Sequence, residues 1–186
     1  MKHIVSDETA GDFRAGDWLQ THSGRQFWPL DPRPDDVDIH DIAHALSMLC
    51  RFGGHCDKFY SVAEHSIHVS NYSRDDALWG LLHDASEAYL VDIPRPLKRM
   101  MPNYREIEEG VQQAICRAFD LPKAMPARVE FVDRAILMDE RLQIMSGSTQ
   151  AWSTDIEPLG VSIGGYQPST AKILFLETFH RVMRAR

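Results

Sequence analysis

The chain has 186 residues, of which 44% are hydrophobic and 25% are charged, and its formal net charge is −7. This length and composition are typical of one globular domain with its own core. The negative charge argues against a surface that coats nucleic acid. The three cysteines form no CxxC pair, and no apolar run approaches the ~20 residues of a membrane span or resembles a signal peptide. We therefore expect a cytoplasmic protein with no nucleic-acid partner and no membrane partner.

The first part of the chain predicts a short hairpin ahead of the first helix. Residues 1–17 are polar without a clear period, and we interpret them as an N-terminal arm. Residues 18–30 place aromatic side chains on both sides of a Ser-Gly turn, which is typical of a β-hairpin that needs helices to lie against. Apolar residues recur at helical spacing over residues 38–50. The His40-Asp41 pair lies in the first turn of that helix, where we interpret Asp41 as stabilising the helix dipole.

Helical patterns also dominate the rest of the chain. Two capping boxes precede helices, and they lie at residues 61–64 and 73–76. Later helical patterns cover residues 103–119, 127–145 and 169–184. We interpret residues 92–99 as a tight loop with three cations, and residues 147–167 as a loop long enough for a lid or a subunit contact. The sequence therefore predicts a single all-α domain, residues 1–186, with a small N-terminal β-hairpin and a helical core at 38–145.

The stretch with the clearest chemistry is residues 81–87, LLHDASE. Read as one helix, it places His83, Asp84 and Glu87 within an arc of roughly 100°. An imidazole and two carboxylates behind two leucines are costly to bury unless something pairs with them. A divalent metal ion with an activated water would pair with all three. The alternative is an ordinary amphipathic helix, in which these polar residues lie at the border between the buried face and the solvent-exposed face.

A metal at His83 and Asp84 needs ligands from other helices. His65 lies on the helix just before this stretch, and His68 is its rival on a similar face. For a later carboxylate, the candidates are Asp133 and Asp139, and helical spacing favours Asp133 slightly. In chain order, the favoured residues then form a His…His-Asp…Asp pattern in an all-helical chain.

This ordered pattern resembles the HD-domain metal-dependent phosphohydrolase superfamily, whose fold is a helical bundle. The resemblance covers about residues 20–145. Segments similar to those of bacterial 5′-deoxyribonucleotidases are SVAEHS, HDASE and DIPRPLK. The chain is more similar still to phage-type HD proteins that include dATP triphosphohydrolases, through the segments IAHALS and CRF.

The resemblance implies a role for each matching residue. The implied metal ligands are His65, His83, Asp84 and Asp133. The implied catalytic residues are Asp84 and Glu87, of which Glu87 is the carboxylate that orients or deprotonates the attacking water. The implied substrate-binding residues are Arg51, Phe52, Asp92, Pro96 and Lys98, with Phe52 standing where relatives often have Trp.

The donor set and the histidine count narrow the expected chemistry. Two imidazoles and two carboxylates suit Mn²⁺, Co²⁺, Ni²⁺, Fe²⁺ or Zn²⁺ better than Ca²⁺, and Mg²⁺ is a further candidate. No histidine lies between Asp84 and Asp133, where two-metal members of the superfamily need more of them, so we expect one ion per subunit. The resemblance implies a phosphohydrolase that acts on deoxynucleotides, and the favoured activity is that of a dNTP triphosphohydrolase that releases triphosphate. The alternatives are a 5′-deoxyribonucleotidase on dNMPs and a non-catalytic nucleotide-binding HD module, and relatives suggest a homo-oligomer, either a dimer or a hexamer.

Overall fold

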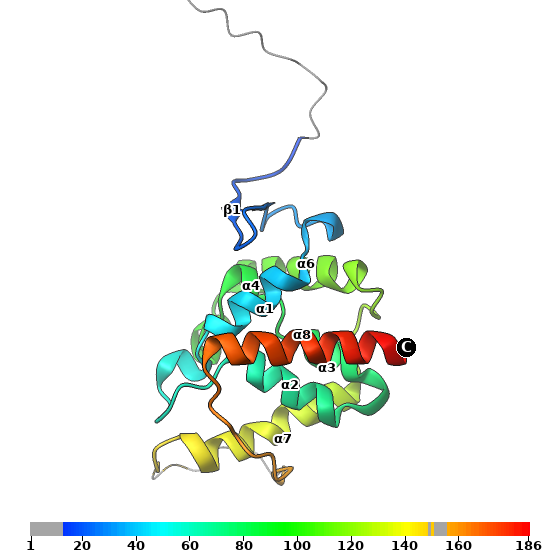
Figure 1. Ribbon diagram of the computed structural model, residues 1–186. Coiled ribbons are helices and arrows are strands. Elements are labelled where there is room, and N and C mark those ends of the chain that lie inside the picture. Colours follow the sequence, from blue (N-terminus) through cyan, green and yellow to red (C-terminus); the bar gives the residue numbers. More distant parts are fainter. Residues whose placement is uncertain (1–12, 149, 151–155) are drawn as a thin grey trace, which may run out of the picture.

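Helices make up most of the fold, as the apolar periodicity predicts (Figure 1). The computed structural model describes residues 13–148, 150 and 156–186, so most of the predicted arm lies outside the described residues. The helices are α1 (Ile39–Met48), α2 (Val62–Tyr72), α3 (Ala77–Leu82), α4 (Glu87–Leu90), α5 (Arg95–Lys98), α6 (Pro102–Ala118), α7 (Ala127–Ile144) and α8 (Pro168–Ala185), with the 3-10 turns η1 (Pro34–Asp36), η2 (Arg51–Gly54) and η3 (Arg74–Asp76). None of the described helices combines the length and the apolar character of a membrane span. The prediction of an all-α fold is therefore confirmed.

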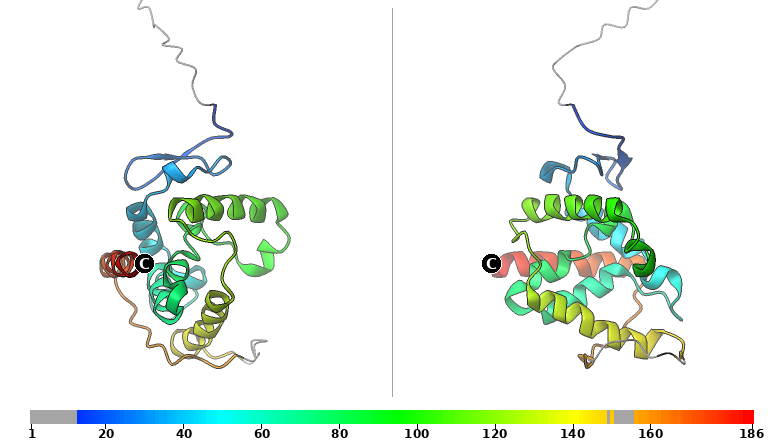
Figure 2. Two further views of the ribbon diagram at one scale, coloured as in Figure 1. Left: turned by 90° about the vertical axis from the view of Figure 1, so that its right-hand side faces the viewer. Right: turned by 180° about the vertical axis from the view of Figure 1, so that it is seen from behind.

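Helix α2 lies at the centre of the bundle and packs against α1, α3, α7 and α8. Figure 2 shows α6 and α7 on opposite sides of this central helix. Ile42, Leu46, Leu81 and Phe175 are fully buried where α1, α3 and α8 meet. Each such side chain stabilises the fold by roughly 1.5–3 kcal/mol through its burial. The central position of α2 explains why a polar residue on this helix needs partners from its neighbours.

The predicted hairpin is present and lies against helices. Strands β1 (Leu19–Gln20) and β2 (Gln26–Phe27) pair antiparallel, and Phe27 is fully buried. Asp41 accepts hydrogen bonds from the backbone N–H and the hydroxyl of Ser23, at 2.7 and 2.8 Å, so it holds the hairpin on α1. The side chain that caps α1 is Asp38, which accepts from the N–H of His40 at 2.8 Å. Besides its place in the first helical turn, Asp41 thus has a tertiary role that the sequence did not predict.

The stretch at residues 81–87 is not the single helix that its spacing predicts. Helix α3 ends at Leu82 and α4 begins at Glu87, with a turn between them. In a continuous helix the Gly80 carbonyl would accept from the N–H of Asp84. Here the side chain of His83 makes a 2.8 Å hydrogen bond to that carbonyl, and Glu87 N–H bonds three residues back, to Asp84, at 3.0 Å. The turn leaves His83 and Asp84 at the end of α3, where they reach the interior of the bundle.

Two smaller expectations also change. The second capping box does not form, because the hydroxyl of Ser73 donates back to the carbonyl of Val69 at the end of α2, at 2.7 Å. Ser73 is buried where α3 approaches α2 closely: a Cβ added at Gly80 would lie 2.8 Å from its hydroxyl oxygen. The predicted loop at residues 92–99 contains the short helix α5. The helices predicted at 103–119, 127–145 and 169–184 agree with α6, α7 and α8 to within one residue at each end.

The described part of the long loop, residues 156–167, is held against α7 and α2. Asp139 accepts from the backbone N–H groups of residues 159–161 at 2.8–3.1 Å. Glu64 accepts in the same way from residues 164–166 at 2.7–3.0 Å. Two buried carboxylates thus anchor this segment. Residues 149 and 151–155 of the predicted loop lie outside the described residues.

Candidate metal centre and adjoining pocket

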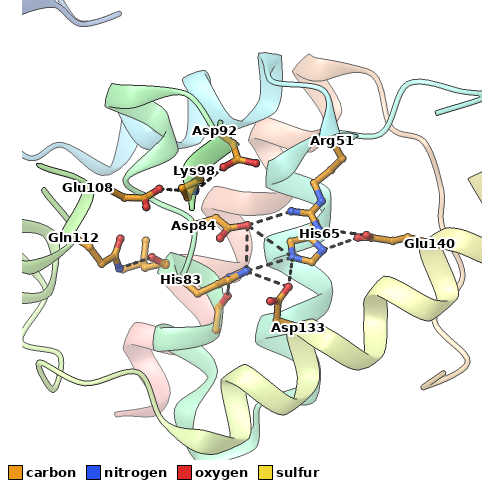
Figure 3. A network of polar contacts seen from close by, with 12 residues as sticks. Arg51, His65, His83, Asp84, Asp92, Lys98, Glu108, Gln112, Asp133 and Glu140 are labelled. Carbon is orange, nitrogen blue, oxygen red and sulfur yellow. Dashed lines mark hydrogen bonds and ion pairs between the residues drawn. The ribbon is translucent and has the colours of Figure 1, made fainter. Parts of the chain in front are cut away.

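Side chains from three parts of the chain converge at one point of the bundle (Figure 3). His65 comes from α2, Asp133 from α7, and His83 from the turn after α3. The Nε2 atoms of His65 and His83 are 3.2 Å apart. Asp133 Oδ1 lies 3.1 Å from His65 Nε2 and 3.7 Å from His83 Nε2. The ligand atoms of these three residues lie within 4.8 Å of one another, so the group could hold a metal ion.

The second ring nitrogen of each histidine already has a partner. His65 Nδ1 lies 2.6 Å from Glu140 Oε1, and His83 Nδ1 lies 2.8 Å from the carbonyl oxygen of Gly80. Burial raises the pKa of Glu140, but Arg51 and His65 lower it below its usual value, so this carboxylate is ionised. Because a carboxylate and a carbonyl only accept, both Nδ1 atoms donate. A metal ion that replaces the proton on Nε2 would therefore find both rings already oriented, with Nδ1 donating and Nε2 directed at the centre.

The separations and charges at this point fit a metal ion. Donors about 2.1 Å from an octahedral ion lie about 3.0 Å apart when they are adjacent. The distances of 3.1 Å and 3.2 Å from His65 Nε2 to Asp133 and His83 are close to that value. Burial disfavours charge on His83, but Asp84 and Asp133 raise its pKa well above the usual value. The centre therefore attracts positive charge, which either a proton or a metal ion can supply.

Asp84 extends this cluster and connects it to Arg51. Its Oδ2 lies 3.2 Å from His83 Nε2 and 3.8 Å from His65 Nε2. The same oxygen lies 3.3 Å from Arg51 Nη1, and Arg51 Nη2 lies 3.3 Å from Glu140 Oε2. Burial raises the pKa of Asp84, but the charges of His83 and Arg51 lower it below its usual value. Arg51 thus joins Asp84 to the carboxylate that holds His65.

Glu140 is a residue of this site that sequence reasoning missed. Its side chain is 0% exposed, and it contacts both His65 and Arg51. It follows Asp133 by seven residues, or about two helical turns, so both carboxylates project from the same face of α7. The seven-residue spacing can be read from the sequence, and it places Glu140 on the same helix face as the predicted ligand Asp133.

The structure separates the predicted ligands from their rivals. His68, on α2, has its Nε2 3.7 Å from Glu64 Oε1 and is not part of the cluster. Asp139, on α7, accepts from backbone N–H groups of residues 159–161 instead. His68 thus lies beside a carboxylate of its own helix, and Asp139 anchors the loop that follows α7.

A pocket of about 790 Å³ adjoins the metal centre. His83, Asp84 and Glu87 line one side of it, and residues of α6 line the other. The side chain of Glu87 is largely buried, and burial together with the Asp84 charge raises its pKa well above the usual value. The pocket is thus lined by two predicted metal ligands, His83 and Asp84, and by the carboxylate of Glu87, which is not a predicted ligand.

The predicted substrate contacts are placed in different ways. Lys98 lines the pocket, with its Nζ 2.7 Å from Asp92 Oδ1 and 2.8 Å from Glu108 Oε1. Pro96 is exposed on α5. Phe52 is partly buried against the core cluster around α7, with Arg51 Cζ 5.5 Å from its ring centroid. The structure therefore brings Lys98 to the pocket, whereas Asp92 contacts Lys98 without lining the pocket, and Arg51 contacts the candidate metal centre.

Two curated proteins are similar to this chain over most of its length. The uncharacterized protein YfdR of Escherichia coli strain K12 is 39% identical over 136 residues, which cover 73% of this chain and 76% of that protein. The uncharacterized protein RCAP_rcc00048 of Rhodobacter capsulatus is 31% identical over an alignment that covers 90% of this chain and 96% of that protein. No family model matches the chain. At this identity and coverage, the chain belongs to the same protein family as YfdR of Escherichia coli.

Proposed function

We propose that this protein is a metal-dependent phosphohydrolase of the HD-domain superfamily that acts on deoxynucleotides. The observation that carries the proposal is the pair of imidazole Nε2 atoms 3.2 Å apart, with Asp133 Oδ1 3.1 Å from one of them. These residues occur in the order that the superfamily resemblance implies. The adjoining pocket of about 790 Å³ supports the proposal, because small-molecule sites are typically about 300–1,000 Å³.

Four side chains would hold one divalent ion: His65, His83, Asp84 and Asp133. Their mixed nitrogen and oxygen donors suit Mn²⁺, Co²⁺, Ni²⁺, Fe²⁺ or Zn²⁺, and Mg²⁺ is a further candidate. When bound, such an ion acidifies water and polarises phosphoryl oxygens. Glu140 and the Gly80 carbonyl support this role, because they hold each ring with its Nε2 directed at the centre.

Glu87 is the proposed general base. It lines the pocket beside Asp84, so it can accept the proton of the attacking water. The water oxygen forms a bond to the α-phosphorus while the bond from that phosphorus to O5′ breaks, and O5′ takes up a proton. Lys98 supplies positive charge for the phosphates from within the pocket, while Arg51 supplies it from its position between Asp84 and Glu140.

The proposed substrate is a deoxynucleoside triphosphate, and the products are the deoxynucleoside and triphosphate. The alternative substrate is a deoxynucleoside monophosphate, in which hydrolysis breaks the same bond from phosphorus to O5′. The segments shared with 5′-deoxyribonucleotidases favour this alternative, whereas the more extensive similarity to the phage-type proteins favours the triphosphate. A non-catalytic nucleotide-binding module is the third possibility.

Metal analysis of the purified protein, combined with a nucleotide assay, tests the proposal. The protein is loaded with each candidate ion and incubated with dNTPs and dNMPs, and the products are scored for phosphate, pyrophosphate and triphosphate. We expect bound metal and release of triphosphate from a dNTP. Phosphate from dAMP without triphosphate from dATP would select the 5′-deoxyribonucleotidase, and nucleotide binding without any product would select the non-catalytic module.

Two substitutions on α2 provide a matched comparison. His65→Gln should abolish metal binding and turnover, whereas His68→Gln, one turn further along the same helix, should preserve both. Glu87→Gln should abolish turnover but spare metal and nucleotide binding. Full activity of the Glu87 variant would show that this residue is not the general base. Equal effects of the two histidine variants would contradict a metal site at His65.

A further inference from the structure

Gln112, on α6, holds a buried oxygen without a partner at the edge of the pocket. The residue is 8% exposed and lines the pocket together with His83, Asp84 and Glu87. Figure 3 shows Gln112 on the side of His83 that lies away from His65. Its Nε2 donates to the carbonyl oxygen of Leu82 at 3.0 Å. Among the described residues, no donor makes a hydrogen bond to its Oε1. Buried acceptors are rarely left unpaired in proteins, so this oxygen points to a partner that comes from outside the chain.

The orientation of this amide follows from its neighbour. The Leu82 carbonyl can only accept, so the amide nitrogen must face it, and a flipped amide would place two oxygens against each other. The oxygen of Gln112 is therefore the end that has no hydrogen-bond partner among the described residues. Because Leu82 directly precedes His83, the hydrogen bond to its carbonyl holds Gln112 beside the candidate metal centre.

The surroundings of Gln112 indicate which ligand group it suits. Other side chains of α6 that line the pocket include Glu108 and Glu109, which also accept hydrogen bonds when ionised. An ionised phosphate oxygen also only accepts, so the oxygen of Gln112 cannot pair with one, and the pocket's cations for phosphate are Lys98 and Arg105. The oxygen of Gln112 suits an N–H or O–H group, and in a nucleotide such groups belong to the sugar and the base.

We propose that Gln112 is a specificity-determining residue that accepts a hydrogen bond from an N–H or O–H donor of the bound deoxynucleotide. The donor belongs either to the 3′-hydroxyl of the sugar or to the amino group of the base. This inference rests on the proposed function, because it takes a deoxynucleotide as the occupant of the pocket. It identifies a residue that selects the substrate, in addition to those that bind metal or handle water.

The test compares wild type with Gln112→Met, which keeps the length of the side chain but removes the acceptor. Each protein is assayed for kcat/KM with dATP, with its 3′-deoxy analogue, and with its analogue that lacks the amino group of adenine. We expect wild type to prefer dATP over one of these analogues by about tenfold to a hundredfold, and the variant to lose that one preference. The analogue that shows the effect identifies the donor as the hydroxyl or the amino group.

The preference ratio separates recognition from a structural role, because a distorted pocket would lower activity on all three substrates equally. Gln113→Met is the matched control, since Gln113 is only partly buried and donates instead to Glu109 and to the Lys123 carbonyl. Unchanged ratios in the Gln112 variant would overturn the inference. The partner of the oxygen would then be a water molecule and not the substrate.

Failure of the proposed function would look different, because wild type would then hydrolyse none of the three substrates. In that case calorimetric binding of the same three nucleotides replaces the rates. A preference for dATP over one analogue in wild type that disappears in the variant would support the inference. Equal ratios, or no binding of any nucleotide, would overturn it.

Discussion

Replacing Glu140 by Gln tests how the metal centre is assembled. Glu140 is fully buried, with its carboxylate 2.6 Å from His65 Nδ1 and 3.3 Å from Arg51 Nη2. Gln keeps the size of the side chain and can accept a hydrogen bond from His65, but it removes the negative charge that makes the imidazole a stronger ligand. Loss of such a supporting partner typically lowers metal affinity by about 10–100-fold, or about 1.4–2.7 kcal/mol. We expect a decrease of that size.

Titration calorimetry of metal-free protein with Mn²⁺ measures this affinity directly. Glu130→Gln provides the matched control, because Glu130 lies exposed on the same helix. The control should bind Mn²⁺ like wild type. Circular dichroism confirms that each variant is folded before the titration. If folded Glu140→Gln binds Mn²⁺ as tightly as wild type, then Glu140 does not support His65 as a ligand.

Three further substitutions test the fold around the site. Asp139→Asn should destabilise the protein by about 1–3 kcal/mol in urea unfolding. Both carboxylate oxygens of Asp139 accept from the N–H groups of residues 159–161, and Asn replaces one of these oxygens by an NH₂ group, which cannot accept. Gly80→Ala should cost about 1–3 kcal/mol and weaken Mn²⁺ binding, since its Cβ would lie 2.8 Å from Ser73 Oγ and push α3 from α2. Burial raises the pKa of Asp41, but hydrogen bonds from the hairpin lower it below its ordinary value, so its contribution to stability is present above about pH 4 and is lost as the pH falls further. Asp41→Asn should therefore be less stable at pH 7 and lose less stability than wild type on acidification, as measured by urea unfolding at pH 7 and pH 3.

Apolar spacing predicted the helices around the site, but the set of ligands came mainly from the resemblance of the residue order to the HD-domain superfamily. The structure brings the ligand atoms of His65, His83 and Asp133 within 4.8 Å of one another. The two rivals were harder to exclude from spacing. His68 and Asp139 occupy the same helices as His65 and Asp133, and the structure shows His68 directed at Glu64 of its own helix and Asp139 bonded to the distant loop segment.

What the sequence could not predict depends on contacts between distant segments. Glu140 and His65 are 75 residues apart, and their hydrogen bond requires α7 to pack against α2. The break in the helix at His83 has the same origin, because the side chain bonds to the Gly80 carbonyl while its other nitrogen faces His65. Neither feature follows from the local periodicity that predicted the helices.

The charges around the centre explain how Arg51 and a divalent ion can coexist there. Asp84, Asp133 and Glu140 carry negative charge, Arg51 carries one positive charge, and imidazoles that donate from Nδ1 and keep Nε2 free are neutral. Two negative charges remain, and a divalent ion cancels them. If Arg51 moved onto a substrate phosphate, it would leave two carboxylates without their cation, which is costly at a buried site. Lys98 also pairs with two carboxylates, but the side chain of Asp92 is 52% exposed, whereas Glu140 is fully buried. The charge balance therefore favours Lys98 as the cation that contacts phosphate while Arg51 stays between Asp84 and Glu140.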